Sequence, residues 1–112
     1  MADPLPYVLI VYGTLKPGKM EEFKKYFQPL AEYVNANEGG CLSYQLSVGE
    51  ENPDSLVIFE RYISKAYLEQ VHQESAAFKK FKEDVLSADM WVEKSASRYY
   101  EAPTPQYGFM AR

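Results

Sequence analysis

The sequence predicts an α+β domain of ferredoxin-like type, in which a four-stranded antiparallel sheet carries its helices on one face. Three observations lead to this fold class. The hydrophobic patterns follow the order β-α-β-β-α-β, and the chain of 112 residues has the length of one domain. With 46% hydrophobic and 25% charged residues, the chain can bury one core, which excludes a disordered protein.

The first strand and the first helix are predicted from residues 7–34. Residues 7–15 are rich in Val, Leu, Ile and Tyr and end at Lys16-Pro17-Gly18, which is typical of a strand followed by a turn. From residue 20 to residue 34 the apolar side chains recur at helical spacing and predict a long helix. Pro29 lies inside this helix and lacks a backbone N–H, so we expect a kink or a break there.

Two adjacent strands are predicted in the middle of the chain. A turn cluster with two glycines at 35–40 precedes residues 42–48, where apolar and polar residues alternate with a period of two. The loop 49–55 contains Asn-Pro-Asp, and the run 56–63 after it is almost wholly apolar. Because the loop is short, these strands are expected to pair as an antiparallel hairpin.

The rest of the chain predicts helical segments and a fourth strand. Ser64 can cap a helix over residues 65–73, and Ser75 can cap another over residues 76–87. One bent helix and two separate helices are both compatible with this pattern. Residues 91–101 then predict the last strand.

The predicted domain covers residues 7–101, with tails at 1–6 and 102–112. In this fold both helical segments lie on one face of the sheet, and nothing covers the other face. Tyr and Val side chains there would leave a larger apolar patch than monomers usually tolerate, so we expect a homodimer. The ten tyrosines suit such an interface or a wet cavity, although Tyr is also a common strand residue.

Composition and charge argue against several kinds of protein. The net charge of −4 and the scattered lysines make nucleic-acid binding unexpected. The single cysteine, Cys41, and the single histidine, His72, leave no internal disulfide and no metal cluster of the Cys/His kind. Residues 1–6 lack a basic n-region, and the apolar run 7–12 is too short for a membrane span. We therefore expect a cytoplasmic protein without a membrane partner.

Four stretches follow one another along the chain in a specific order. They are residues 15–19 (LKPGK), 38–44 (EGGCLSY), 53–62 (PDSLVIFERY) and 66–72 (AYLEQVH), the last followed by Ser75 and Phe78. As a set, they resemble the antibiotic biosynthesis monooxygenase domains of the dimeric α/β-barrel superfamily.

The resemblance implies a homodimer whose two sheets form a barrel, with a small apolar pocket in each subunit between sheet and helices. Members of the family include oxygenases that use no cofactor on quinols or polyketide phenols, haem-degrading enzymes, and an isomerase of a phosphorylated signal. Haem degradation is disfavoured, because the first strand has no Asn and the only Trp, Trp91, lies elsewhere. The implied ligand is small and apolar or aromatic, and no cofactor or metal is implied.

His72 is the candidate catalytic residue. It matches the histidine that the family commonly carries in this helix, whereas the second histidine often found a few residues later falls near Ala77, which cannot replace it. An imidazole titrates near neutrality, so in a pocket it could take a proton from a phenol or enol and return it. The alternative is a helix-end or surface histidine with no chemical role.

Aromatic residues are expected to form the pocket wall. Tyr12, Tyr44, Tyr62 and Tyr67 could stack on a flat substrate and donate a hydroxyl hydrogen bond, with Phe78 beside them. Each of these side chains could instead be ordinary core packing.

Glu60 and Cys41 are two further candidates for chemistry. Glu60 interrupts the apolar third strand, where burying it without a partner would be costly. Its neighbour Arg61 points to the other face of the sheet. We therefore expect a structural ion pair of Glu60 with Arg98 or Lys94, and not acid catalysis. Cys41 has no basic neighbour, so a nucleophile is not expected there.

The sequence leaves two hypotheses. The first is a cofactor-independent monooxygenase, or a related isomerase, of a small aromatic or quinol-like substrate with His72 as general base. The second is a non-catalytic dimeric binding or stress-response protein. A solvent-exposed His72, remote from any cavity, would favour the second.

Overall fold

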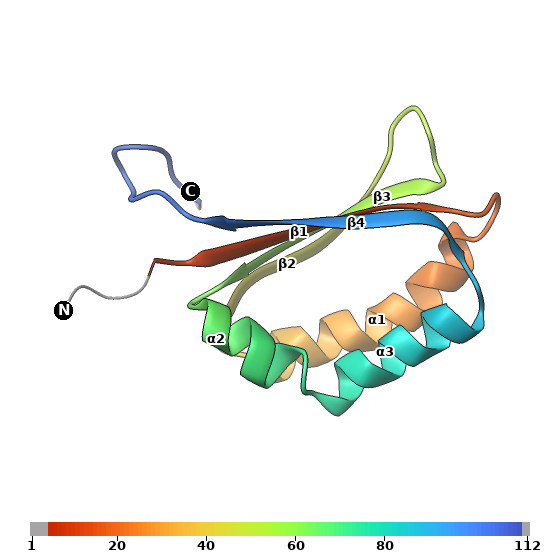
Figure 1. Ribbon diagram of the computed structural model, residues 1–112, viewed down its shortest axis with the longest axis horizontal. Helices are drawn as coiled ribbons and strands as arrows, with labels where there is room; N and C mark the ends of the chain where they lie inside the picture. The colour runs from red at the N-terminus through yellow and green to blue at the C-terminus, as the bar shows by residue number, and fades with distance from the viewer. Residues whose placement is uncertain (1–4, 111–112) are drawn as a thin grey trace.

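The structure is a computed structural model that describes residues 5–110. The elements follow the predicted order, as Figure 1 shows. They are β1 (Tyr7–Leu15), α1 (Met20–Asn37), β2 (Cys41–Val48), β3 (Ser55–Tyr62), α2 (Lys65–Tyr67), the π-helical turn η1 (Leu68–His72), α3 (Ala76–Ser87) and β4 (Trp91–Tyr100). No helix in the described range is long and apolar enough to cross a membrane.

The sheet is antiparallel throughout and has the order β2-β3-β1-β4. All helices lie on one side of it, and the other side carries only the β2–β3 loop and the segment after β4 (Figure 1). Leu9 pairs with Glu60 of β3 and with Arg98 of β4. Because directly paired residues share a face, these side chains point together toward the helices.

The core lies between the sheet and α1. Phe23 and Phe27 of α1 are buried against Leu56 and Ile58 of β3, while Val85 brings α3 into the same cluster. The helical spacing seen in the sequence therefore corresponds to the face that α1 turns toward the sheet.

Of the kink or break expected at Pro29, the break is absent, because α1 runs from Met20 to Asn37 without interruption, and the kink stays a prediction. Pro29 is exposed, whereas Phe27 and Leu30 on either side of it are buried. The carbonyl that loses its hydrogen bond thus lies toward solvent, where water can satisfy it, and the core contacts hold the helix together.

The two serine caps are confirmed. The hydroxyl of Ser64 accepts a hydrogen bond from the Tyr67 amide, and that of Ser75 accepts one from the Phe78 amide. The choice left open by the sequence is settled in favour of two helical segments, separated after His72.

Candidate functional site

His72 is held in the interior by the π-helical turn. The Gln73 amide donates to the Leu68 carbonyl, five residues back, at 2.9 Å. The wider turn puts Leu68 and His72 on the same buried face, with His72 only 1% exposed. Such single π-turns occur frequently at functional sites.

A hydrogen bond orients the imidazole. His72 Nδ1 lies 2.9 Å from Oε1 of Glu38, the residue that directly follows α1, and both side chains are buried. A carboxylate accepts only, so this bond assigns the proton of the neutral ring to Nδ1. Nε2 then carries the lone pair, and it has no hydrogen-bond partner among residues 5–110.

A second carboxylate lies on the other side of the ring. Glu60 Oε1 is 3.9 Å from His72 Nε2, too far for a hydrogen bond, and it accepts one from the Tyr62 hydroxyl at 2.5 Å. Only 4% of Glu60 is exposed. The ring is therefore flanked by carboxylates from β3 and from the end of α1.

Burial sets the protonation states of this cluster. Desolvation lowers the pKa of His72 below its usual value, and the Glu38 carboxylate offsets part of that shift. Desolvation raises the pKa of Glu60 to about 7, against the lowering effect of the Tyr62 hydrogen bond. At neutral pH the imidazole is thus neutral and able to accept a proton at Nε2.

A cavity of about 160 Å³ lies between the sheet and the helices. His72 and Glu60 line it, together with Tyr44, Phe78 and Phe81. It adjoins an open groove of about 660 Å³ along α3, and Phe78, Phe81 and Trp91 border both spaces. His72, whose Nε2 has no hydrogen-bond partner among residues 5–110, therefore lies on the wall of a mostly apolar cavity.

Two of the predicted pocket aromatics line this cavity. Tyr44 and Phe78 have ring centroids 5.2 and 5.0 Å from that of His72. Tyr62 is fully buried behind Glu60, with its ring 5.5 Å from that of His72, and Tyr67 packs on Tyr62 at 6.4 Å. Tyr62 and Tyr67 thus support the cluster from behind.

Tyr12 is the exception among the predicted pocket residues, because it lies on the opposite face of the sheet. It pairs with Val57 and Ser95, and it borders a shallow depression with Thr14 and Ser47. Side chains alternate along β1, so the inward positions of Leu9 and Val11 require Tyr12 to point outward.

The expected ion pair of Glu60 with Arg98 or Lys94 is also wrong. Within residues 5–110 neither cation comes within 4.0 Å of that carboxylate, although both line the same cavity and act on it electrostatically. Arg61 does point away, as expected, and forms a two-pronged ion pair with Glu101 at 2.5 and 2.7 Å.

Burial, with the nearby carboxylates, raises the pKa of the Cys41 thiol to about 12, so little thiolate forms at neutral pH. Across the described part of the chain, no three His, Cys, Asp or Glu side chains are arranged to hold a metal ion. Glu38 was missed as a site residue, because a Glu in a Gly-rich turn gives no local sign of burial.

Three comparisons place these features among known proteins. Residues 6–84 match the family described as antibiotic biosynthesis monooxygenase. The protein named "Putative monooxygenase YcnE" of Bacillus subtilis (strain 168) is 37% identical over 90 residues, which cover 76% of this chain and 90% of that protein.

Solved structures share the fold. A "putative antibiotic biosynthesis monooxygenase" from Caulobacter crescentus CB15 superposes with a TM-score of 0.80 at 26% identity, over 90% of this chain and 93% of that one. One from Nitrosomonas europaea gives a TM-score of 0.79 at 24% identity, over 90% and 94%, and is similar in fold alone. The predicted fold class and family resemblance are confirmed.

Proposed function

Because this chain belongs to the antibiotic biosynthesis monooxygenase family, we propose that it is a cofactor-independent monooxygenase, or a related isomerase, of a small aromatic or enolisable substrate. His72 is the general base, and Tyr44 and Phe78 form part of the substrate pocket. Family membership supports oxygenase chemistry at a coarse level, while the base and the substrate class are the proposal.

One observation carries the assignment of His72. Its Nε2 is buried and unpaired, on a residue that lines a cavity, while Nδ1 is bonded to Glu38. A buried polar atom without a partner is costly, so a fold retains one where a ligand can satisfy it. A phenol or enol hydroxyl is such a ligand, since it donates a hydrogen bond to Nε2 and can then lose its proton to it.

The chemistry follows from that proton transfer. Removing the proton leaves an electron-rich phenolate or enolate, which can pass an electron to O₂ without a metal or flavin. Hydroquinone and O₂ would give hydroxyquinone and water, with the proton returned from the imidazole. The apolar cavity contributes by orienting the ring and excluding water. In an isomerase, the imidazolium would instead deliver the proton taken from the enol hydroxyl to a carbon of the enolate, which gives the keto form.

The alternative of a non-catalytic binding protein predicts a different environment for His72. A histidine with no chemical role is expected at the surface or with both ring nitrogens satisfied. His72 is 1% exposed and borders a cavity, which supports the enzyme.

Oxygen uptake by the purified protein with a panel of hydroquinones tests the proposal. We expect turnover by the wild type and a loss of roughly a hundredfold or more in His72→Ala, because general-base catalysis contributes about that factor. Equal rates for the two proteins would remove the proposed role of His72.

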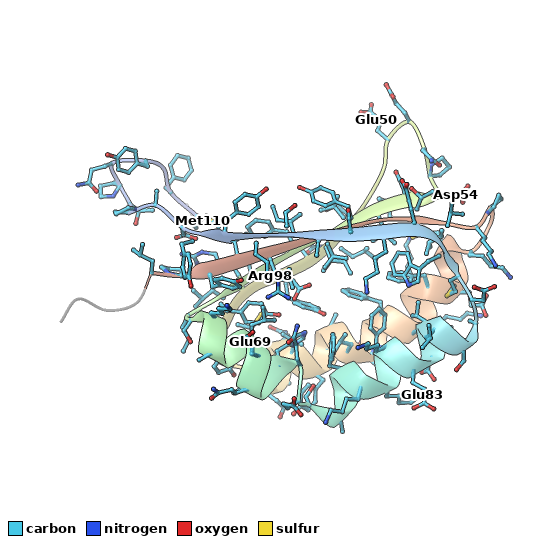
Figure 2. The ribbon with its side chains drawn as sticks, in the orientation of Figure 1. Glu50, Asp54, Glu69, Glu83, Arg98 and Met110 are labelled. Carbon is cyan, nitrogen blue, oxygen red and sulfur yellow. The ribbon has the colours of Figure 1, made fainter. Side chains whose placement is uncertain are left out.

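A second variant keeps the test decisive if His72→Ala fails to fold. Glu38→Gln retains a hydrogen-bond acceptor but removes the charge that raises the pKa of His72. Its acid limb in the pH–rate profile should therefore move to lower pH, which a purely structural role would not produce. The exposed carboxylate of Glu83 on α3, labelled in Figure 2, supplies the matched control Glu83→Gln.

A further inference from the structure

The cavity has a basic edge that the proton-transfer chemistry does not use. Lys94, Ala96 and Arg98 alternate along β4, and each lines the cavity that contains His72. They pair with Gly13, Val11 and Leu9 in turn. The pairing puts both cations on the helix-facing side of the sheet.

Position in the sheet explains why these side chains remain accessible. β4 is an edge strand, and Lys94, Ala96 and Arg98 are all exposed although they point toward the helices. Figure 2 shows Arg98 beneath β4, on the helix side of the sheet. The inner face of β4 is therefore an open margin of the cavity and not part of the core.

Lys94 and Arg98 lack the ion pairs that other cations of the described chain form. Within residues 5–110, neither Lys94 nor Arg98 forms an ion pair; Lys94 lies 5.6 Å from the centre of the Trp91 ring, and Arg98 makes a long 3.5 Å bond to the Tyr7 hydroxyl. Lys79 and Lys80 on α3, by contrast, are paired with carboxylates at 3.0 and 2.8 Å. Two unpaired cations at one cavity margin are notable in a chain of net charge −4.

The positive margin continues into the adjoining groove. Lys94 borders both the cavity and the groove, and Lys82 borders the groove from α3. The nearby carboxylates are Glu60, which lines the same cavity and interacts electrostatically with both cations without an ion pair, Glu69, which acts on Arg98 from η1, and Glu74, which is paired with Lys79. Glu69 is exposed, so solvent screens its effect on Arg98.

We propose that the substrate carries an anionic group, a carboxylate or a phosphate, which binds at the β4 margin formed by Lys94 and Arg98. The aromatic or enolic part then lies in the apolar cavity beside His72. This inference rests on the proposed function, because it takes the same cavity as the substrate site. A guanidinium and an ammonium at one end, with a base at the other, give the substrate a single orientation.

Binding measured without oxygen tests this proposal separately from catalysis. The probes are 2,5-dihydroxyphenylacetate, its neutral methyl ester, and 4-hydroxyphenyl phosphate, each titrated calorimetrically into the full-length protein under anaerobic conditions. We expect at least one acid to bind about fivefold or more tightly than the ester, as one well-formed charged contact provides. A preference between the two acids identifies the group that the margin selects.

Charge-removing variants locate the contact. Lys94→Met and Arg98→Met should each weaken binding of the preferred acid by about three- to tenfold and leave the ester unchanged. Lys25→Met is the matched control, because Lys25 is an exposed lysine of α1 away from the cavity. Added salt should weaken binding of the acid more than that of the ester.

The inference is overturned if neither acid binds more tightly than the ester, or if Lys25→Met has the same effect as Lys94→Met. This result does not depend on oxygen-uptake measurements. If the β4 margin binds acids but the protein has no oxygenase activity, only the proposed function is contradicted. The His72→Ala variant should still bind the acid.

Discussion

Burial of Glu60 couples the stability of this protein to pH. The pKa of Glu60 is raised to about 7 in the folded state, from an ordinary value near 4.5. Between these two values the folded chain binds more protons than the unfolded chain, so the free energy of unfolding falls as pH rises. The loss is complete above the folded pKa and amounts to no more than about 3.5 kcal/mol. His72 acts in the opposite sense, because its lowered pKa reduces stability as pH falls below 6.5.

Glu60→Gln separates the two contributions. The amide oxygen can still accept the bond from Tyr62, but Gln does not ionise. We expect wild type to lose stability relative to this variant between about pH 5 and about pH 8, measured by urea denaturation. Parallel stability curves for the two proteins would contradict a raised pKa at Glu60.

Sequence could identify single candidate residues of the site but not their partners, and the reason is physical. That His72 is a candidate was predictable, because it is the one histidine of the sequence and lies in an amphipathic segment, while its role as a base stays a prediction. Its partnership with Glu38 was not, since the two residues are 34 positions apart and meet only through packing. Glu60 was recognised as unusual, but its partner is the Tyr62 hydroxyl two residues on, and the cations expected to neutralise it lie at the margin of the cavity.

At the scale of elements, close packing joins the α1–β2 loop to α2. The Ile63 amide donates to the Gly40 carbonyl at 2.9 Å, and the Tyr67 ring lies directly over Gly40. A Cβ added to Gly40 would lie 2.3 Å from Tyr67 Cε2, whereas one added to Gly39 meets nothing within 4 Å. This contact brings the loop that carries Glu38 against the segment that leads to His72.

Gly40→Ala should therefore destabilise the protein by about 1–3 kcal/mol, the usual cost of overpacking. Gly39→Ala is the matched neighbour and should change stability by less than about 0.5 kcal/mol. Thermal and urea unfolding of both variants measure the difference. Equal effects would mean that the loop and α2 are not packed as described.

The elements themselves were largely predictable from periodicity. β1 coincides with the predicted run, and the other strands differ from the prediction by one residue at an end or at both ends. The break considered at Pro29 does not occur, and sequence alone does not reveal that the lost hydrogen bond faces water. Tyr12 was misassigned for a different reason: the alternation along β1 was known, but the pocket residues were chosen by type and not by strand face.

For the whole molecule, the outer face of the sheet is the distinctive feature, because no helix of residues 5–110 covers it (Figure 1). Ile10 and Tyr12 of β1 lie there beside Phe59 and Val57 of β3, their pairing partners, and all helices are on the other side (Figure 1). An apolar strip along the two central strands suits a second copy of the same surface, which a two-fold axis would bring face to face. The homodimer therefore stays a prediction with a defined surface.

Sedimentation at micromolar concentration should give the mass of two chains, because interfaces of stable dimers bury about 800 Å² per partner or more and a sheet face can supply that area. Tyr12→Glu puts a charge in the middle of the strip and should shift the protein toward one chain. Val71→Glu is the control, since Val71 is equally exposed but lies on η1, on the helical side. A wild-type mass of one chain, or equal dissociation by the two variants, would show that this face does not join two copies. The cavity and the basic margin of β4 would then have to function within a single chain.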